Sequence, residues 1–408
     1  MFLPDYVKKV TDIINGAGEK AFPVGGCVRD SIMGKTPDDY DIAVSCPPRK
    51  TELLLHDYRV IETGIKHGTV TVVSDGHNLE LTTFRVDGVY RDNRRPESVV
   101  FTDEITDDLS RRDFTVNAIA YSETDGYIDP FGGEKDIADG IIRCVGEPDK
   151  RFNEDALRIV RGMRFASKLG FSVEEKTAAS MIKNRALLNN IAGERIFAEL
   201  KKLLVGKNAA EILIRFKDIV LTLFPEAKKL SDGELTSCFA GVSGATCPET
   251  AFAAMLFGVS GEETAGILAR LKTDGAFRDT VLLLGDACRE YDAESARLCD
   301  GERGKTAYLR IFCGKYGKNK TALFAELLRL TRGDADYAAE SFVAEGCKES
   351  ISLKSLAVGG RDISKLGLRG VRIGDALDRL VTLAALGEVQ NEKTALLDRI
   401  ADFDEFSV

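Results

Sequence analysis

The chain has 408 residues, of which 44% are hydrophobic, and a formal net charge of −9 at pH 7. This length predicts two to four domains with ample core, and no apolar run is long enough to predict a membrane-spanning helix. Nine cysteines without CxxC pairs indicate neither a zinc site nor a disulfide framework. The opening residues MFLPDYVKKV lack the apolar core of a signal peptide, so the expected location is the cytoplasm.

Charge is unevenly distributed along the chain. There are fourteen basic and eight acidic residues between Arg143 and Lys207, and six basic and two acidic residues from Lys348 to Arg372. Basic stretches in an acidic chain are typical of a localised phosphate-binding track, although solvated helix faces give the same pattern.

The first predicted elements lead into a short, motif-rich stretch. Residues 4–18 are predicted to form an amphipathic helix, and Gly25 to Val44 reads GGCVRDSIMGKTPDDYDIAV. Residues 40–44 are predicted to form a buried strand, and alternation along it places Asp39 and Asp41 on one face. Two carboxylates this close repel unless a cation lies between them. Mg²⁺ fits, because it binds carboxylate oxygens and reaches phosphate oxygens.

The same stretch contains features suited to phosphate. Gly25 and Gly26 let the backbone approach an anion closely, and Arg29 offers a fork of donors to a phosphate. Alone, an Asp-x-Asp or a Gly-Gly pair is more often a turn. Their combination before an apolar strand favours a triphosphate and metal site.

Next come a predicted helix, residues 47–57, and strands between residues 58 and 85. Asp75-Gly76 predicts a hairpin turn between the last two of these strands. Glu80 faces away from the side chains on either side of it. It is either a third carboxylate near the metal or a solvent-facing strand residue.

Two further segments before residue 140 carry candidate site residues. Residues 85–101 are polar and rich in turn formers, which predicts a long loop of functional importance. Residues 107–121, DDLSRRDFTVNAIAY, are predicted to be helical. Arg112 can meet a phosphate, and Asp113 and Asn117, four apart, can hold a ribose hydroxyl.

From about residue 140 the pattern changes to successive helices. The most informative covers residues 153–171, with Asn153 as the predicted N-cap. Polar residues step by three along one of its faces. These are Asp155, Arg158, Arg161 and Arg164. Taken alone, such a stripe is also typical of exposed ion pairs.

The segments GGCVRD, DDYD, RRDFTVNA, DPFGG, EDALRIVRGMRFA and ERIFAEL, within residues 20–205, together resemble a known family. They resemble the class II CCA-adding tRNA nucleotidyltransferases, which share a superfamily with bacterial poly(A) polymerases. A second match, LAVGGRDISKLGLRGVRIGDALDRLV followed by NEKTALL, resembles the tail of the Gram-positive type. The departures, Ile32-Met33 and Gly359-Gly360, do not fall on catalytic positions.

The resemblance implies an α+β N-terminal nucleotidyltransferase head, with a mixed β-sheet and helices, followed by an all-α neck, body and tail in an elongated, curved molecule. The implied boundaries are 1–140 for the head, 141–205 for the neck with a nucleotide-base template, 206–345 for the body and 346–408 for the tail, which would bind the tRNA arm.

The resemblance also implies roles for individual residues. Asp39 and Asp41 would bind Mg²⁺ and support attack by the RNA 3′-hydroxyl on the α-phosphate. The other matched positions are Gly26, Arg29 and Arg112 for the phosphates, Asp113 and Asn117 for the sugar, Asp155 and Arg158 for the base, and Arg161 and Arg164 for placing the nucleotide. The loop at residues 86–101 would correspond to the family's flexible loop.

A template made of protein is chemically sound. Cytosine and adenine each present an amine beside an unprotonated ring nitrogen, so an Asp accepts from the amine while an Arg donates to the nitrogen. Uracil and guanine present a carbonyl and an N–H instead. Each mismatched buried contact costs roughly 1–3 kcal/mol.

The expected function is therefore template-independent addition of C-C-A to the 3′ end of tRNA, with CTP and ATP as substrates and the tRNA acceptor stem and adjoining arm as partner. Three alternatives to this function remain open: a poly(A) polymerase, a split-activity enzyme that adds only A or only C-C, and an RNA-binding module with an inactive transferase domain.

Overall fold

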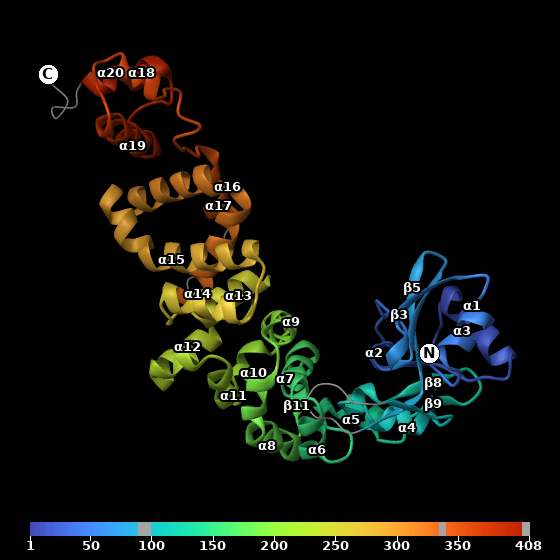
Figure 1. The fold of residues 1–408 in the computed structure, drawn as a ribbon. Helices are drawn as coiled ribbons and strands as arrows, with labels where there is room; N and C mark the ends of the chain where they lie inside the picture. Colours follow the sequence, from blue (N-terminus) through green and yellow to red (C-terminus); the bar gives the residue numbers. More distant parts are fainter. Residues whose placement is uncertain (89–98, 334–339, 402–408) are drawn as a thin grey trace. The chain divides into compact units, whose positions relative to one another are not determined.

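The computed structural model describes residues 1–88, 99–333 and 340–401. Contacts between residues divide the chain into two units, Met1–Pro225 and Glu226–Val408. Figure 1 draws both units as a ribbon coloured along the sequence.

The first unit is built on a seven-stranded sheet. Parallel pairing of β2 with β5 within otherwise antiparallel neighbours makes the sheet mixed, as predicted. Across the sheet, the strands are β3 (Arg59–Gly64), β4 (Thr69–Ser74), β5 (His77–Thr83), β2 (Asp41–Val44), β1 (Ala21–Val24), β8 (Ala120–Ser122) and β9 (Gly126–Ile128).

The strands predicted between residues 58 and 85 are confirmed as β3, β4 and β5. Asp75 and Gly76 both have positive φ, 48° and 80°, which the tight turn between β4 and β5 requires. The strand predicted at residues 40–44 is confirmed except that it begins at Asp41. This strand lies in the middle of the sheet, so its first residue is held from both sides.

Helices cover the sheet and connect its strands. They are α1 (Asp5–Gly16), α2 (Gly26–Ile32), α3 (Pro48–Leu54) and α4 (Ile105–Ser110). The predicted first helix is confirmed: Pro4 precedes it, and Val7, Val10 and Ile14 are its buried stripe. The helix predicted at 47–57 is confirmed with shorter bounds.

The loop predicted at residues 85–101 has ordered ends. Strand β6 (Arg85–Asp87) pairs antiparallel with β7 (Val99–Phe101) in a separate two-stranded ribbon. The rest of the predicted loop, 89–98, lies outside the described residues.

The single helix predicted at residues 107–121 is wrong. Helix α4 ends at Ser110, a 3₁₀ turn, η2 (Thr115–Asn117), follows, and β8 begins at Ala120. The Asp113 side chain accepts a hydrogen bond from the Phe114 backbone N–H at 2.9 Å, and Phe114 forms a β-bridge with Cys144. Local side-chain bonding of this kind competes with a helix.

The helix predicted at residues 153–171 is interrupted at its start. Helix α6 (Pro148–Glu154) ends first, Asp155 is extended, and α7 (Leu157–Leu169) then begins. Asn153 is therefore not the N-cap of α7. Instead the Asp155 Oδ1 accepts the Leu157 backbone N–H at 3.1 Å, as an N-cap residue does for a nearby orphan donor.

Helix α7 is the centre of the helical part of this unit and is buried on nearly every side. Around it lie a short parallel pair of strands and further helices. They are α5 (Gly133–Asp139), β10 (Ile141–Ile142), β11 (Ser172–Val173), α8 (Glu175–Lys183), η3 (Arg185–Asn190), α9 (Gly193–Leu204), α10 (Ala209–Arg215) and α11 (Lys217–Leu223).

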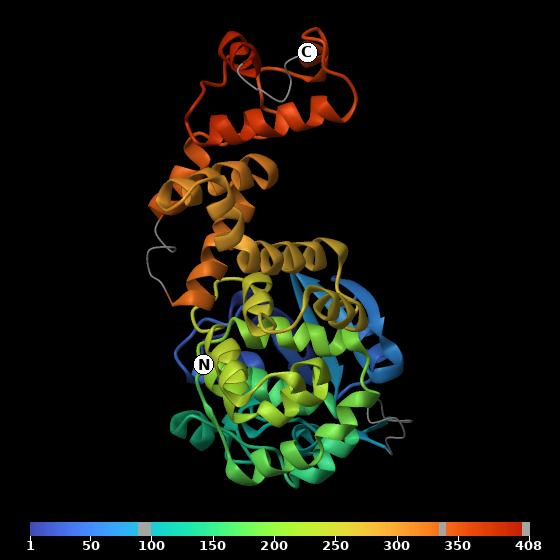
Figure 2. The same cartoon turned by 90° about the vertical axis from the view of Figure 1, so that its left-hand side faces the viewer.

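Within its described residues, the second unit consists of helices and their connections (Figure 2, yellow to red). A 3₁₀ segment, η4 (Pro225–Lys229), spans the division between the units. The helices are α12 (Asp232–Ala240), α13 (Pro248–Met255), α14 (Gly261–Arg270), α15 (Gly275–Leu298), α16 (Glu302–Arg332), α17 (Glu340–Lys348), α18 (Gly360–Ser364), α19 (Val371–Ala385) and α20 (Lys393–Ala401).

The second unit also contains a bond that the cysteine pattern did not predict. Cys313 of α16 and Cys347 of α17 form a disulfide, with their Cα atoms 5.6 Å apart. No helix in the described part of the chain combines the length and hydrophobicity needed to cross a bilayer. The predicted fold class, an α+β head followed by helices, is confirmed.

Gly133 lies where α5 packs on η2, the turn that carries Asn117. A Cβ at Gly133 would lie 2.2 Å from the Thr115 carbonyl oxygen and 2.8 Å from the Ile119 side chain. We expect Gly133→Ala to lower the free energy of unfolding by about 1–3 kcal/mol, as overpacking does, in urea titrations. Gly16→Ala is the control, because a Cβ there meets nothing within 4 Å. Equal stability of the two variants would contradict this packing.

Candidate active site

The two carboxylates predicted to bind metal lie at the start of β2. Asp41 is the first residue of the strand, and in the sheet it pairs with Val24 of β1 and Glu80 of β5. Asp39 precedes the strand, so strand alternation does not govern its direction. Both residues are exposed.

Electrostatics at this edge of the sheet favour a bound cation. Although Asp41 is open to solvent, the protein atoms packed around its carboxyl displace part of its water, and this desolvation raises its pKa to about 6. Arg112 opposes the rise, and Glu80 and Asp39 add to it. A cation among such groups would relieve their repulsion. The described residues contain no cluster of three or more His, Cys, Asp or Glu able to hold a metal. Mg²⁺ commonly takes only one or two protein carboxylates and completes its shell with water and phosphate, so this donor set fits Mg²⁺.

A glycine turn lies between β1 and α2 and receives an arginine. Gly25 has φ 76° and ψ −123°, and its N–H donates to the Ile119 carbonyl oxygen at 3.1 Å. A Cβ at Gly25 would lie 2.8 Å from Arg112 Nη1, so the missing side chain makes room for this guanidinium. At Gly26, a Cβ would meet only Arg29 Nη2, at 3.7 Å. Packing therefore requires glycine at the first position and not at the second.

Arg112 is held at its outer nitrogens but not at Nε. Its Nη2 donates to Asp108 Oδ2 at 3.3 Å, and its Nη1 donates to the Asn117 carbonyl oxygen at 3.4 Å. Arg112 Nε is buried and has no hydrogen-bond partner among the described residues. An arginine next to Gly25 and electrostatically coupled to Asp41 is well placed for an anion such as a phosphate.

Four predicted site residues form one continuous hydrogen-bonded chain. Arg29 Nη1 donates to Asn117 Oδ1 at 2.7 Å, and Asn117 Nδ2 donates to Asp113 Oδ1 at 3.4 Å. Asp113 Oδ2 then accepts from Arg161 Nε at 2.7 Å. The chain joins α2, η2 and α7. Asp113 and Asn117 are thus neighbours as predicted, although not because they share a helix.

Burial and charge act against each other at Asp113. Burial would raise the pKa of this carboxyl, but Arg161 and Arg158 outweigh it, so the pKa lies below its ordinary value. The ionised form is therefore the one that the fold stabilises.

Three arginines make cation–π contacts with one aromatic ring on α7. The guanidinium carbons of Arg29, Arg161 and Arg164 lie 5.5, 5.4 and 3.8 Å from the centre of the Phe165 ring. Glu199 of α9 forms an ion pair with Arg164 at 2.5 Å and lies 3.7 Å from Arg161. Cation–π contact and this carboxylate let three like charges lie close together.

The predicted base-reading residues each have their own partner. Asp155 Oδ2 accepts from Arg195 Nη2 of α9 at 2.8 Å. Arg158 Nη1 donates to Glu154 Oε2 at 2.7 Å, and Arg158 Nη2 donates to the Arg111 carbonyl oxygen at 2.9 Å. Asp155 lies in the break between α6 and α7, and Arg158 lies in the first turn of α7.

Comparison with known proteins identifies the family. The "Poly A polymerase head domain" family matches residues 21–143, and "Probable RNA and SrmB- binding site of polymerase A" matches residues 170–230. The CCA-adding enzyme of Geobacillus thermodenitrificans is 50% identical over 200 residues, and this match spans about half of either protein (49%). That of Streptococcus thermophilus is 33% identical over 405 residues, 97% of each chain. The chain belongs to the family of CCA-adding enzymes.

The fold agrees with this membership. The crystal structure of the Bacillus stearothermophilus CCA-adding enzyme in complex with CTP matches with a TM-score of 0.81 and 30% identity, covering 99% of this chain and 100% of that one. The resemblance inferred from the motifs is thereby confirmed.

Three residues of this CCA-adding family member were not among the predicted site residues. They are Phe165, Arg195 and Glu199. Arg195 and Glu199 lie in ERIFAEL, which served as a family motif without roles for its residues. Their spacing of four on α9 was a signal, because i,i+4 residues share a helix face. That this face points at Asp155 and Arg164 is tertiary information.

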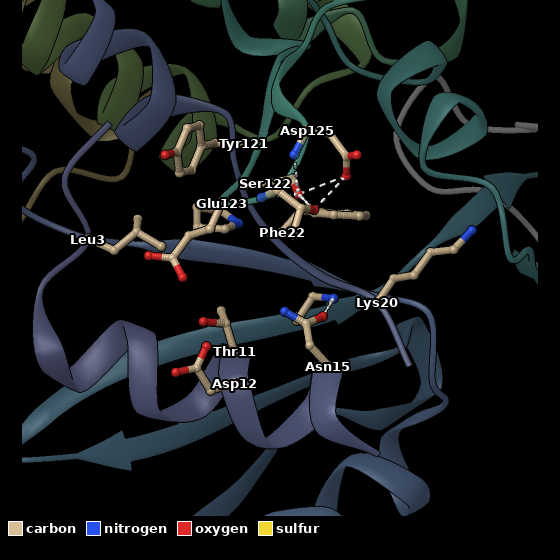
Figure 3. Close-up of a pocket in the computed structure, with 13 residues that line it drawn as sticks. Leu3, Thr11, Asp12, Asn15, Lys20, Phe22, Tyr121, Ser122, Glu123 and Asp125 are labelled. Carbon is tan, nitrogen blue, oxygen red and sulfur yellow. Dashed lines mark hydrogen bonds between the residues drawn. The ribbon is translucent and has the colours of Figure 1, made fainter. Parts of the chain in front are cut away.

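Two cavities in the described part of this family member lie apart from the predicted site residues. One of about 420 Å³ is lined by α1, β1 and the turn from β8 to β9. Figure 3 shows Asp12 and Asn15 of α1 on one side of this space and Tyr121 and Glu123 on the other. A second, also about 420 Å³, lies between α15 and α16. Neither is lined by a predicted site residue.

Asp113 offers a direct test of its ion pair with Arg161. We expect Asp113→Asn to lower the free energy of unfolding at pH 7 by about 1–3 kcal/mol, because it removes the buried carboxylate that pairs with the half-buried Arg161 and leaves that guanidinium only Glu199, 3.7 Å away, as an ion-pair partner among the described residues. The measurement is urea unfolding. Asp139→Asn is the matched control, because Asp139 pairs with Lys135 at the surface, where such pairs contribute little.

The pH dependence has a definite sign. Folding lowers the pKa of Asp113, so its ionised carboxylate stabilises the folded protein above the unfolded aspartate pKa of about 3.9. This stabilisation is lost as the pH falls through the pKa of Asp113 in the folded protein. The difference in free energy of unfolding between wild type and Asp113→Asn should therefore become smaller as the pH falls below about 4. A difference independent of pH would contradict the ionised pair.

Proposed function

We propose that this CCA-adding family member adds C-C-A to the 3′ end of tRNA from CTP and ATP without a nucleic-acid template. The observation that carries the proposal is the hydrogen-bonded chain from Arg29 to Arg161. It links the glycine turn beside Asp41 to α7, whose first turn carries Arg158 and begins just after Asp155, the two residues proposed to read the base.

Asp39 and Asp41 would hold the metal, and their charge pattern and oxygen donors suit Mg²⁺. Bound Mg²⁺ would supply Lewis-acid activation of the RNA 3′-hydroxyl and stabilisation of the leaving pyrophosphate. Glu80, paired with Asp41 in the sheet, is a third carboxylate that would add negative charge at the same edge.

The reaction forms one phosphodiester bond and breaks one phosphoanhydride bond. The 3′-hydroxyl oxygen attacks the α-phosphorus, the bond to the β-phosphate oxygen breaks, and the hydroxyl proton leaves. That proton passes to solvent, because Asp39 and Asp41 are assigned to the metal. Arg112 and Arg29 would bind the triphosphate through charge-assisted hydrogen bonds, with Gly26 at the same turn.

Sugar and base contacts would come from the adjoining elements. Asp113 and Asn117 would bind ribose hydroxyls, and Arg161 and Arg164, spread over Phe165, would place the nucleotide. Asp155 would accept from the exocyclic amine of cytosine or adenine while Arg158 donates to the adjacent ring nitrogen. To do so, these two residues must exchange their present partners, Arg195 and Glu154, for the base.

The RNA would lie along the basic stretches. Contacts to phosphates are independent of sequence and sensitive to salt, and A-form RNA is bound mainly through shape and backbone. The division at residues 140, 205 and 345 into head, neck, body and tail stays a prediction, with the tail binding the far end of the tRNA arm.

The activity is tested by supplying a tRNA that lacks its 3′ end with Mg²⁺, each nucleotide alone, and CTP with ATP together. We expect three residues to be added, followed by a stop, and Asp41→Ala to add none, because it removes a metal-binding carboxylate. Product length on sequencing gels is the measurement.

Other product patterns would overturn the proposal. Open-ended A addition to any RNA would indicate a poly(A) polymerase, and two C's or A alone would indicate split activity. No product at all would favour an RNA-binding module. Addition by Asp41→Ala at the wild-type rate would contradict the metal assignment.

The base-reading assignment is tested by Asp155→Ala. Removing the acceptor should reduce the preference for CTP over UTP by about 10- to 100-fold, the equivalent of one buried hydrogen bond left unmade. The measurement is kcat/KM for each nucleotide. Glu147→Ala, which removes an exposed carboxylate paired with Lys176, should keep the preference. An unchanged preference in Asp155→Ala would overturn the assignment.

A further inference from the structure

Asp108 of α4 is a buried carboxylate placed between two consecutive arginines. Its side chain is 1% exposed. Asp108 Oδ1 accepts from Arg111 Nε at 3.0 Å and from Arg111 Nη2 at 2.7 Å, while Oδ2 accepts from Arg112 Nη2 at 3.3 Å. One carboxylate therefore sets the direction of both guanidinium groups.

The two arginines lead to opposite ends of the proposed nucleotide site. Arg112 lies against Gly25, where the triphosphate is proposed to bind. The Arg111 carbonyl oxygen accepts from Arg158 Nη2 at 2.9 Å, and Arg158 is the proposed donor to the base. Asp108 thus contacts Arg112, the proposed phosphate ligand, directly, and it reaches Arg158, the proposed base ligand, through Arg111.

Arg111 also reaches the ribbon at the base of the long loop. Its Nη1 lies 3.8 Å from Asp87 Oδ2 of β6, and Asp87 pairs with Arg85 at 3.3 Å. The Arg111 side chain is therefore fixed by carboxylates on two elements, α4 and β6. A backbone carbonyl next to such a fixed side chain is a rigid acceptor for Arg158.

We propose that Asp108 is a positioning residue for the incoming nucleotide, acting through Arg112 on the phosphate side and through Arg111 on the base side. The inference rests on the proposed function and deepens it. Asp108 touches neither substrate nor metal in this scheme.

Without the carboxylate, both arginines lose their orientation. Asp108 is the only carboxylate that pairs with Arg112 in the described part of the chain, and Arg112 Nε is already without a partner there. The two like charges, adjacent in sequence, would then repel each other. A side-chain amide at this position keeps the shape but not the charge.

The test compares Asp108→Asn with Asp107→Asn, which removes the neighbouring charge. The Asp107 side chain accepts a hydrogen bond from the Thr102 hydroxyl at 2.8 Å. In the full chain, we expect Asp108→Asn to raise KM for CTP and for ATP on the order of tenfold, the effect of losing one charge-assisted hydrogen bond. KM for tRNA should change by less than about twofold, because Asp108→Asn alters no proposed contact with the RNA.

A purely structural role gives a different result. General loosening would raise KM for tRNA together with KM for the nucleotides, and this outcome, or an unchanged nucleotide KM, would overturn the proposal. Asp108→Glu restores the charge, displaced by one methylene group, and should recover part of the increase in nucleotide KM. If Asp108→Asn does not fold, Asp108→Glu with a nucleotide KM equal to wild type would overturn it.

Equilibrium binding of CTP with Mg²⁺ separates this proposal from the proposed function. Wild type that binds CTP but adds nothing to tRNA would refute the proposed function alone. Weaker CTP binding by Asp108→Asn than by Asp107→Asn would still support the role of Asp108, and equal binding would overturn it.

Discussion

The ion pair of buried Asp113 with half-buried Arg161 is the interaction on which the arrangement of the candidate site depends. Asp113 follows the sheet unit's α4 and Arg161 lies on α7, so the pair joins the mixed sheet to the helical part of the same unit. Burying either charge alone would cost several kcal/mol, whereas removing both together would cost far less. The pair therefore contributes more to the positions of these elements than to stability, and it holds the turn beside Asp41 at a fixed distance from the start of α7.

Carboxylates space the arginines throughout this centre. Asp108 separates Arg111 from Arg112, Asp113 holds Arg161, and Glu199 holds Arg164. A triphosphate site needs several guanidinium groups close together, and their mutual repulsion must be balanced before the anion arrives. The three carboxylates supply part of this balance, and the Phe165 ring contacts the guanidinium groups of Arg29, Arg161 and Arg164. In the proposed function, an incoming triphosphate would find donors that are already oriented, so little free energy would be lost in ordering them on binding.

Much of the sheet and most of the candidate site residues could be predicted from the sequence, because the patterns that indicate them are local. Alternating residues gave β4 and β5, Asp75-Gly76 gave their turn, and the motif order gave the head and the candidate site residues. The errors also have local causes that a periodic pattern does not register. Asp113 bonds its neighbour's N–H, which ends the helix expected across residues 107–121. Asp155 caps α7 from an extended conformation, while the i,i+3 spacing of polar residues continues unchanged across the break. Arg195 and Glu199 were missed because only the packing of α9 against α7 brings them to the site.

The interruption at Asp155 explains how one short segment can present both an acceptor and a donor to a base. In a continuous helix, residues 155 and 158 would share one face, with side chains directed along the same turn. Here the extended Asp155 is released from the helix, and Arg195 on another helix holds its carboxylate. Arg158 remains helical and is held by Glu154 and the Arg111 carbonyl oxygen. Each group thus already has a partner. In the proposed function, a base that offers a donor and an acceptor in the right order would replace two existing contacts with two of the same kind. A base with the opposite order would leave both groups unpaired, so discrimination would arise chiefly from the contacts that a wrong base fails to restore.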